Sequence, residues 1–184
     1  MSQIWPEIGI CGLSCRLCPM YHIKGESRCG GCKSESRKFV GCTLMTCAVK
    51  KKGIEFCWHC EESTVCEKWK KHREFSKHRD SFICYQKLEK NIRFIQEKGV
   101  DEFEKEQRTR EKLLKDMLKE FNEGRSKTFY CITSTVLEIQ ELENALDEAT
   151  KQSEGLETKE KAKILHQLLD KAAERKNCCL KLRK

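Results

Sequence analysis

Cysteine is distributed very unevenly along this chain of 184 residues. Ten of its fourteen cysteines lie between residues 11 and 66, whereas the rest of the chain contains four, at positions 84, 131, 178 and 179. Few apolar side chains separate the ten, so this segment cannot bury enough apolar surface to offset the entropy lost when its backbone is ordered. We therefore expect bound metal to supply part of the folding free energy of residues 1–68.

Disulfides are not expected to take the place of that metal. The N-terminus has neither a basic segment nor a long apolar one, so it does not resemble a secretory signal. No apolar run approaches the ~20 residues that a membrane-spanning helix needs. These features predict a cytoplasmic protein with no membrane partner. Thiols stay reduced in that compartment, where a dense cysteine cluster is typical of metal binding.

The spacing of the cysteines predicts which of them share an ion. Three pairs have the spacing C-x2-C, and two intervening residues allow a tight turn that places both sulfurs about 2.3 Å from one ion. If neighbours combine, one site consists of Cys15, Cys18, Cys29 and Cys32, and a second of Cys42, Cys47, Cys57 and Cys60. Interleaved pairing is equally compatible with the spacing. The predicted metal ligands are Cys11, Cys15, Cys18, Cys29, Cys32, Cys42, Cys47, Cys57, Cys60 and Cys66.

Two histidines are candidate extra ligands. His22 and His59, together with Cys11 and Cys66, would raise the inventory to twelve, so two or three tetrahedral zinc ions are expected. An iron–sulfur cluster is the alternative, because four-cysteine ligation is common to zinc and to such clusters. The spacing C-x3-C-x2-C at residues 11–18 also occurs in radical S-adenosylmethionine enzymes. The chain has neither the length nor the strands of their barrel.

The rest of the chain carries apolar residues at helical spacing, and the expected fold is mainly α. We predict a metal-stabilised, cysteine-rich knuckle region with little regular structure over residues 1–68, followed by a charged helical domain resembling a bundle over residues 69–184. Gly99 predicts the end of a helix that contains Leu88 and Ile92. A later helix is expected to begin at Ser126 and to continue through Ala149, and residues 152–155 predict a turn.

Five segments carry a family resemblance: C-G-L-S-C-R-L-C-P-M-Y (11–21), C-G-G-C-K (29–33), C-T-L-M-T-C-A (42–48), C-W-H-C (57–60) and Cys66. They are similar to the small cysteine-rich prokaryotic proteins catalogued as domain of unknown function 3795. Residues 91–107 are also similar to segments that follow the cysteine region there. Val65 departs from the pattern, which usually has proline before the last cysteine. The resemblance implies a cytoplasmic, metal-binding prokaryotic protein and brings no activity or substrate with it.

The chain has a formal charge of +8, and one run, residues 68–79, is rich in basic residues. Its lysines, arginines and histidines interleave with Trp69 and Phe75. Basic residues among aromatic ones can follow phosphates and stack on bases, so nucleic-acid binding is an alternative function. The favoured interpretation is a solvated helix face, with Trp69 in the core where the two parts of the chain meet and with His72 and His78 on the surface.

A second motif, Gly124-Arg125-Ser126-Lys127, lies where one predicted helix ends and the next begins. Arg125 and Lys127 beside free N–H groups are candidate anion-binding residues. Ordinary capping by Gly124 and Ser126 explains the same motif and is the favoured interpretation.

No feature of the sequence points to catalysis. Paired carboxylates, a nucleophile–base pair and a phosphate-binding loop are not evident, and the predicted ligands suffice to close the metal sites. The sequence therefore favours a non-enzymatic zinc-binding module whose helical tail binds another protein. An iron–sulfur redox or sensor protein, and a nucleic-acid-binding protein that uses residues 68–79, remain the alternatives.

Overall fold

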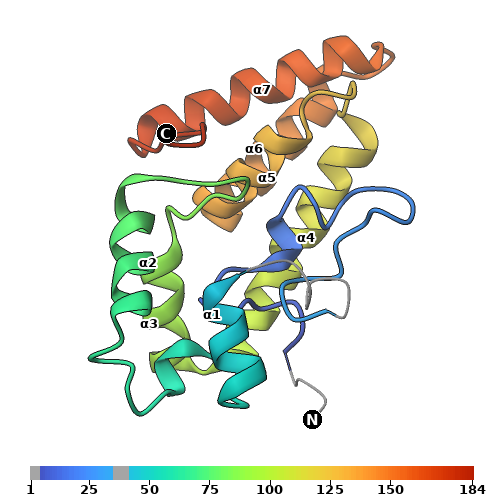
Figure 1. Cartoon of the computed structure of the whole chain (residues 1–184). Coiled ribbons are helices and arrows are strands. Elements are labelled where there is room, and N and C mark those ends of the chain that lie inside the picture. Colours follow the sequence, from blue (N-terminus) through green and yellow to red (C-terminus); the bar gives the residue numbers. More distant parts are fainter. Residues whose placement is uncertain (1–4, 35–41) are drawn as a thin grey trace.

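The computed structural model describes residues 5–34 and 42–184, and within them the fold is mainly α, as predicted (Figure 1). These residues contain no strand, only one isolated antiparallel bridge between Ile8 and Ser14. The helices are α1 (Thr43–Met45), α2 (Glu67–His78), α3 (Leu88–Lys98), α4 (Val100–Glu120), α5 (Lys127–Val136), α6 (Ile139–Gln152) and α7 (Thr158–Arg175).

The described part of the cysteine-rich head, residues 5–34 and 42–66, has little regular structure besides short turns. Two of its C-x2-C pairs sit on 3₁₀ turns, Cys15–Leu17 and Cys57–His59, and a π-helical turn, Thr46–Lys51, continues α1. In each 3₁₀ turn the N–H of the second cysteine donates to the carbonyl of the first, at 3.1 Å for Cys18 and 3.2 Å for Cys60. The short spacing therefore produces the tight turns that the sequence predicts.

Helices α4 to α7 form the main apolar core. Figure 1 shows α7 lying across α5 and α6, and the α6–α7 connection contains Gly155 in a left-handed conformation with φ +75°. Leu142, Leu165 and Leu169 are fully buried along this seam. The turn predicted over residues 152–155 is thereby confirmed.

The single helix predicted from Ser126 through Ala149 is in fact two. Helix α5 ends at Val136, and Glu138 starts α6 with a capping box in which it and Glu141 bond each other's backbone N–H. The buried guanidinium of Arg110 on α4 donates to the carbonyls of Ser134 at 2.9 Å and Leu137 at 2.6 Å. Arg110 thus takes carbonyls that a continuous helix would have used, an interaction that the local sequence does not reveal.

The head completes its apolar core with residues from beyond position 68. Leu13, Leu44 and Met45 of the head pack in one cluster with Trp69 of α2 and with Leu88 and Ile92 of α3. A smaller cluster joins Ile8 and Phe56 to Ile95 and Phe103. The scarcity of apolar residues between the cysteines is therefore partly relieved by tertiary contacts with α2, α3 and α4.

Two ionic contacts fasten distant segments of the chain. Arg16 of the head reaches Glu104 and Glu111 on α4, at 2.7 and 2.6 Å. Arg183, near the C-terminus, binds Asp80 between α2 and α3, with Nε 2.9 Å from Oδ2.

None of the described helices has the length and apolarity that a membrane crossing requires.

Candidate metal centre

The cysteines of the head gather in two groups. In the first, the Cys32 N–H donates to the Cys15 sulfur at 3.3 Å. A Cβ atom built at Gly9 would lie 3.5 Å from the Cys11 sulfur and 3.9 Å from the Cys32 sulfur, so both thiols flank the same stretch of backbone. Cys18 lies within electrostatic range of Cys29 and Cys32. The first group therefore consists of Cys11, Cys15, Cys18, Cys29 and Cys32, and Cys11 also lies near Cys42 and Cys57.

The second group surrounds a small cavity of about 30 Å³. Four cysteines line it, Cys47, Cys57, Cys60 and Cys66, together with apolar side chains that include Leu44 and Trp69. Cys42 lies within electrostatic range of Cys57 but does not line this cavity. The structure thus brings Cys66, the cysteine left over by neighbour pairing, to the place predicted for Cys42.

The thiols stand in surroundings that oppose their ionisation unless a cation is bound. Burial, and then the neighbouring Cys66, raise the pKa of Cys57 to about 12. Burial and Cys32 likewise raise the pKa of Cys11 well above its ordinary value. A metal ion reverses this effect, because thiolates bound to a divalent cation are deprotonated outright.

Within residues 5–34 and 42–184, no three His, Cys, Asp or Glu side chains stand in a geometry that would hold an ion. The thiols are grouped but not converged on one point. Their chemistry fits zinc or an iron–sulfur cluster, since both prefer thiolate ligands. The predicted ligand set remains a prediction.

Two lysines lie against the thiols, and neither contact is predicted from the sequence. Lys33 is buried beside the first group, where its ammonium binds Glu55 at 2.7 Å and lies 4.3 Å from the centre of the Phe56 ring. Lys52 lies 3.3 Å from the Cys60 sulfur and 2.8 Å from Glu62. Lys33 directly follows Cys32, so its position in the sequence could have predicted a contact with the first cysteine group. A four-thiolate zinc site carries a net negative charge, which such cations offset.

The two candidate histidines have other neighbours. The ring nitrogen Nε2 of His22 lies 2.6 Å from the carbonyl oxygen of Arg16 and donates to it. His59 is exposed and packs edge-on to Phe56 and Trp58. Trp58 stacks on Phe56 with ring centres 4.6 Å apart.

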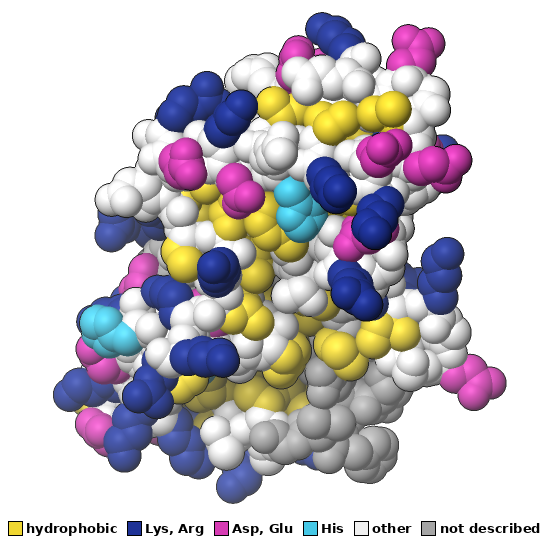
Figure 2. All heavy atoms as spheres, turned by 90° about the horizontal axis from the view of Figure 1, so that it is seen from above, with side chains coloured by type: hydrophobic (Ala, Val, Ile, Leu, Met, Phe, Trp, Pro, Cys, Tyr) yellow, Lys and Arg dark blue, Asp and Glu magenta, His cyan; other side chains and the backbone are white. Residues whose placement is uncertain are grey.

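The basic run forms most of α2. Trp69 is 4% exposed and sits in the apolar cluster of the head, so it is not available for stacking on a base. Arg73 pairs with Glu89, and Lys77 with Glu74. His78 is exposed, as predicted. The prediction that His72 also lies on the surface is wrong, because His72 is half-buried and stacks on Trp69. On the face seen in Figure 2, acidic side chains lie among the basic ones, although the basic ones are more numerous at the lower left.

The Gly124–Lys127 motif is a helix start without the expected cap. Gly124 has φ +102°, and Ser126 is the N-cap of α5, but its hydroxyl does not bond the helix backbone. Ser126 Oγ instead lies 2.6 Å from Glu123 and 2.7 Å from His166. Arg125 is exposed at an open hollow that also contains Glu123, and Lys127 does not line it. The hollow contains charges of both signs, because Glu157, Lys159 and Lys163 line it too.

The four cysteines outside the head differ in their exposure. Cys84 and Cys131 are buried in apolar packing, whereas Cys179 is exposed and Cys178 half-buried near the C-terminus.

Residues 7–71 match the model of a family described as "Protein of unknown function (DUF3795)". This match confirms the resemblance read from the cysteine motifs, and it covers both cysteine groups and the first part of α2. No curated protein and no solved structure shows significant similarity to the chain.

Proposed function

We propose that the head is a zinc-binding module that the helical tail holds in place. The observation that carries the proposal is the cavity of about 30 Å³ lined by Cys47, Cys57, Cys60 and Cys66. A hollow of this size accommodates about one small ion or water molecule. Four thiolates are a complete tetrahedral ligand set for a structural zinc ion.

A second ion is proposed for the first group, with ligands drawn from Cys11, Cys15, Cys18, Cys29 and Cys32. Lys33 and Lys52 support both assignments, because each places a cation near thiols that would be anionic. An iron–sulfur cluster on the same ligands is the alternative, and the two differ in colour and in metal content.

Metal analysis of the anaerobically purified full chain tests the proposal. We expect a colourless protein with two to three zinc ions per chain. Cys66→Ser should lower the content by about one ion, because it removes one of four ligands. Cys179→Ser is the matched control, since this exposed thiol lies outside both groups, and it should leave the content unchanged.

Cys42→Ser distinguishes the two ligand sets. Full zinc content in this variant would support the cavity-lining set, whereas loss of one ion would support neighbour pairing. A brown protein containing iron would favour the cluster. A protein that takes up no metal, or a Cys66→Ser variant indistinguishable from the original, would overturn the proposed site.

We propose that another protein binds the helical tail at exposed aromatic side chains. Phe75 and Phe82, at the end of α2 and just beyond it, are large apolar side chains that are 43% and 54% exposed. Exposed aromatic side chains of this kind are enriched at protein–protein interfaces. The proposal predicts that Phe82→Ser leaves folding and metal content intact while it weakens self-association or partner binding.

A further inference from the structure

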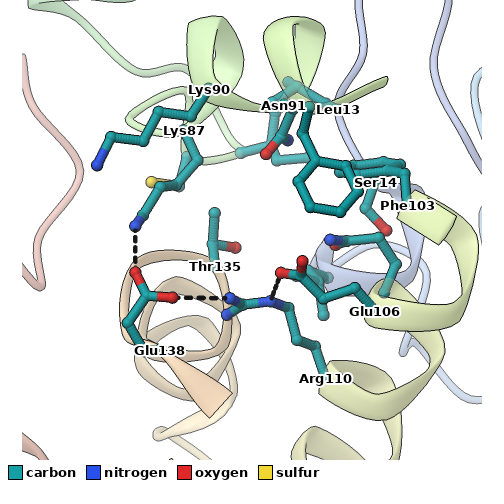
Figure 3. A pocket seen from close by; sticks show the side chains of 15 residues that line it. Leu13, Ser14, Lys87, Lys90, Asn91, Phe103, Glu106, Arg110, Thr135 and Glu138 are labelled. Atoms are coloured by element: carbon teal, nitrogen blue, oxygen red, sulfur yellow. Dashed lines mark hydrogen bonds and ion pairs between the residues drawn. The ribbon is translucent and has the colours of Figure 1, made fainter. Parts of the chain in front are cut away.

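A cavity of about 250 Å³ opens where the head meets the helical tail, and none of the ten predicted metal ligands lines it. Its walls come from the segment Leu13–Leu17, from α3, from α4 and from the α5–α6 connection (Figure 3). One part of the wall is apolar and includes Leu13, Phe94 and Phe103. A volume just below the usual range for ligand pockets suits a small molecule and not a nucleotide.

Most charges along this wall are paired with one another. Arg110 Nε lies 2.8 Å from Glu106, and Nη2 lies 3.7 Å from Glu138. Glu138 in turn accepts from Lys87 at 3.1 Å (Figure 3). The Nη1 group of Arg110 donates to the carbonyls of Ser134 and Leu137 at the end of α5. These four side chains therefore balance, with two positive and two negative charges.

Lys90 differs from the other charged residues of the wall. It forms no salt bridge with a described acidic side chain, although its charge helps to lower the pKa of Glu138, and it lies exposed at the mouth, one helical turn after Lys87. Both lysines belong to the N-terminal end of α3, where the helix dipole also favours negative charge. With Lys87, Lys90 and Arg110 against Glu106 and Glu138, the wall carries a net positive charge, and Lys90 places it at the opening.

One buried polar group in the wall lacks a partner. Ser14 is 6% exposed, and its hydroxyl has no hydrogen-bond partner among the described residues. The side chain of Gln107 also lines the cavity. Buried polar groups are ordinarily hydrogen-bonded, so the unpaired Ser14 hydroxyl in this wall indicates a missing partner.

We infer that this cavity binds a small aromatic monocarboxylate that carries a hydroxyl group. The carboxylate would lie at Lys90, the ring against Phe94 and Phe103, and the hydroxyl near Ser14 and Gln107. Figure 3 shows Lys90 and Ser14 on opposite sides of the hollow, as a molecule with polar groups at both ends requires. This assignment is independent of the metal sites.

Titration of the metal-loaded full chain with 4-hydroxybenzoate, followed by amide chemical shifts, tests the inference. We expect saturable shifts at residues of this cavity, and binding of 4-hydroxybenzamide about tenfold weaker because it lacks the charge. Lys90→Gln should weaken 4-hydroxybenzoate binding by a similar factor. Lys98→Gln, an exposed lysine of the same helix outside the wall, should leave it unchanged.

Ser14→Ala separates the two ends of the ligand. It should weaken the binding of 4-hydroxybenzoate but not of benzoate, which has no hydroxyl. Absence of saturable shifts at millimolar ligand, or equal binding of acid and amide together with no effect of Lys90→Gln, would show that the hollow is only a packing void. Zinc content measured on each variant keeps a failure here distinct from loss of the metal sites.

Discussion

The guanidinium of Arg16 lies 2.6 Å from the carboxylate of Glu111, and this contact joins the cysteine-rich head to the middle of the longest helix. Arg16 also reaches Glu104 at 2.7 Å, and all three side chains are largely buried. Burial opposes ionisation of Glu111, but hydrogen bonds from Lys115 and Arg16 overcome it and hold its pKa below the ordinary value. The head is therefore positioned by charge as well as by apolar contact.

Arg16→Met should destabilise the protein strongly. Removal of the cation leaves the buried carboxylates of Glu104 and Glu111 with only Arg108 and Lys115, which are both largely exposed. Loss of one partner of a buried pair then costs about 3 kcal/mol of unfolding free energy, the lower end of the usual range, because these two cations remain. Chemical denaturation measures it. Lys105→Met, which breaks only the exposed pair with Glu102, is the control and should have almost no effect. Similar stability for the two variants would contradict a role of Arg16 in holding the head.

Gly31→Ala should destabilise the first cysteine group. Gly31 has φ +104°, and an added Cβ would lie 2.9 Å from the carbonyl oxygen of Pro6 and 3.6 Å from the Cys15 sulfur. We expect a loss of about 1–3 kcal/mol in thermal unfolding, together with reduced zinc content. Gly25→Ala is matched in φ, at +93°, but meets no atom within 4 Å, so it should retain its zinc.

Trp69→Ala should act on stability and not on nucleic-acid binding. The side chain is 4% exposed within the head cluster, and its removal should cost about 3–5 kcal/mol. Lys70→Gln and Lys71→Gln, on the exposed face of α2, should leave the melting temperature unchanged. Salt-dependent binding of single-stranded nucleic acid that these lysine changes abolish would revive the alternative function.

The pH dependence of the C-terminal attachment should follow Asp80. Burial alone would raise its pKa, but hydrogen bonds from the Arg183 side chain and backbone and from the Tyr85 N–H hold it below the ordinary 3.8. A lowered pKa in the folded state means that this stabilisation is complete above pH 3.8 and is lost as the pH falls through the folded value.

Carbon-13 NMR titration of the Asp80 carboxyl group measures this directly. We expect a pKa below 3.8 in the original chain and a higher one in Arg183→Met, because the compensating cation is gone. Lys181→Met, a neighbouring change for which no contact with Asp80 exists among the described residues, should leave the titration unaltered. An Asp80 pKa that does not respond to Arg183→Met would rule out this attachment.

Sequence patterns predicted the features that depend on local chemistry. The C-x2-C spacing produces 3₁₀ turns in two of its three occurrences, at Cys15–Leu17 and Cys57–His59. Apolar residues at spacings of three and four define amphipathic helices regardless of what covers them. The family resemblance, the mainly α fold, the helix end at Gly99 and the turn at residues 152–155 could therefore be stated in advance.

Other features depended on partners that are distant in the chain. Arg110 ends α5 from 24 residues away, and Arg16 meets Glu111 across 95 residues. Whether Cys42 or Cys66 completes the second cysteine group likewise depends on how α1 folds against the start of α2, since both spacings permit ligation. The local sequence determined the helices and turns of this protein. Which buried charges and thiols come into contact was determined by the tertiary structure. The energy of those contacts arises only when segments that are distant in the chain pack together and exclude water.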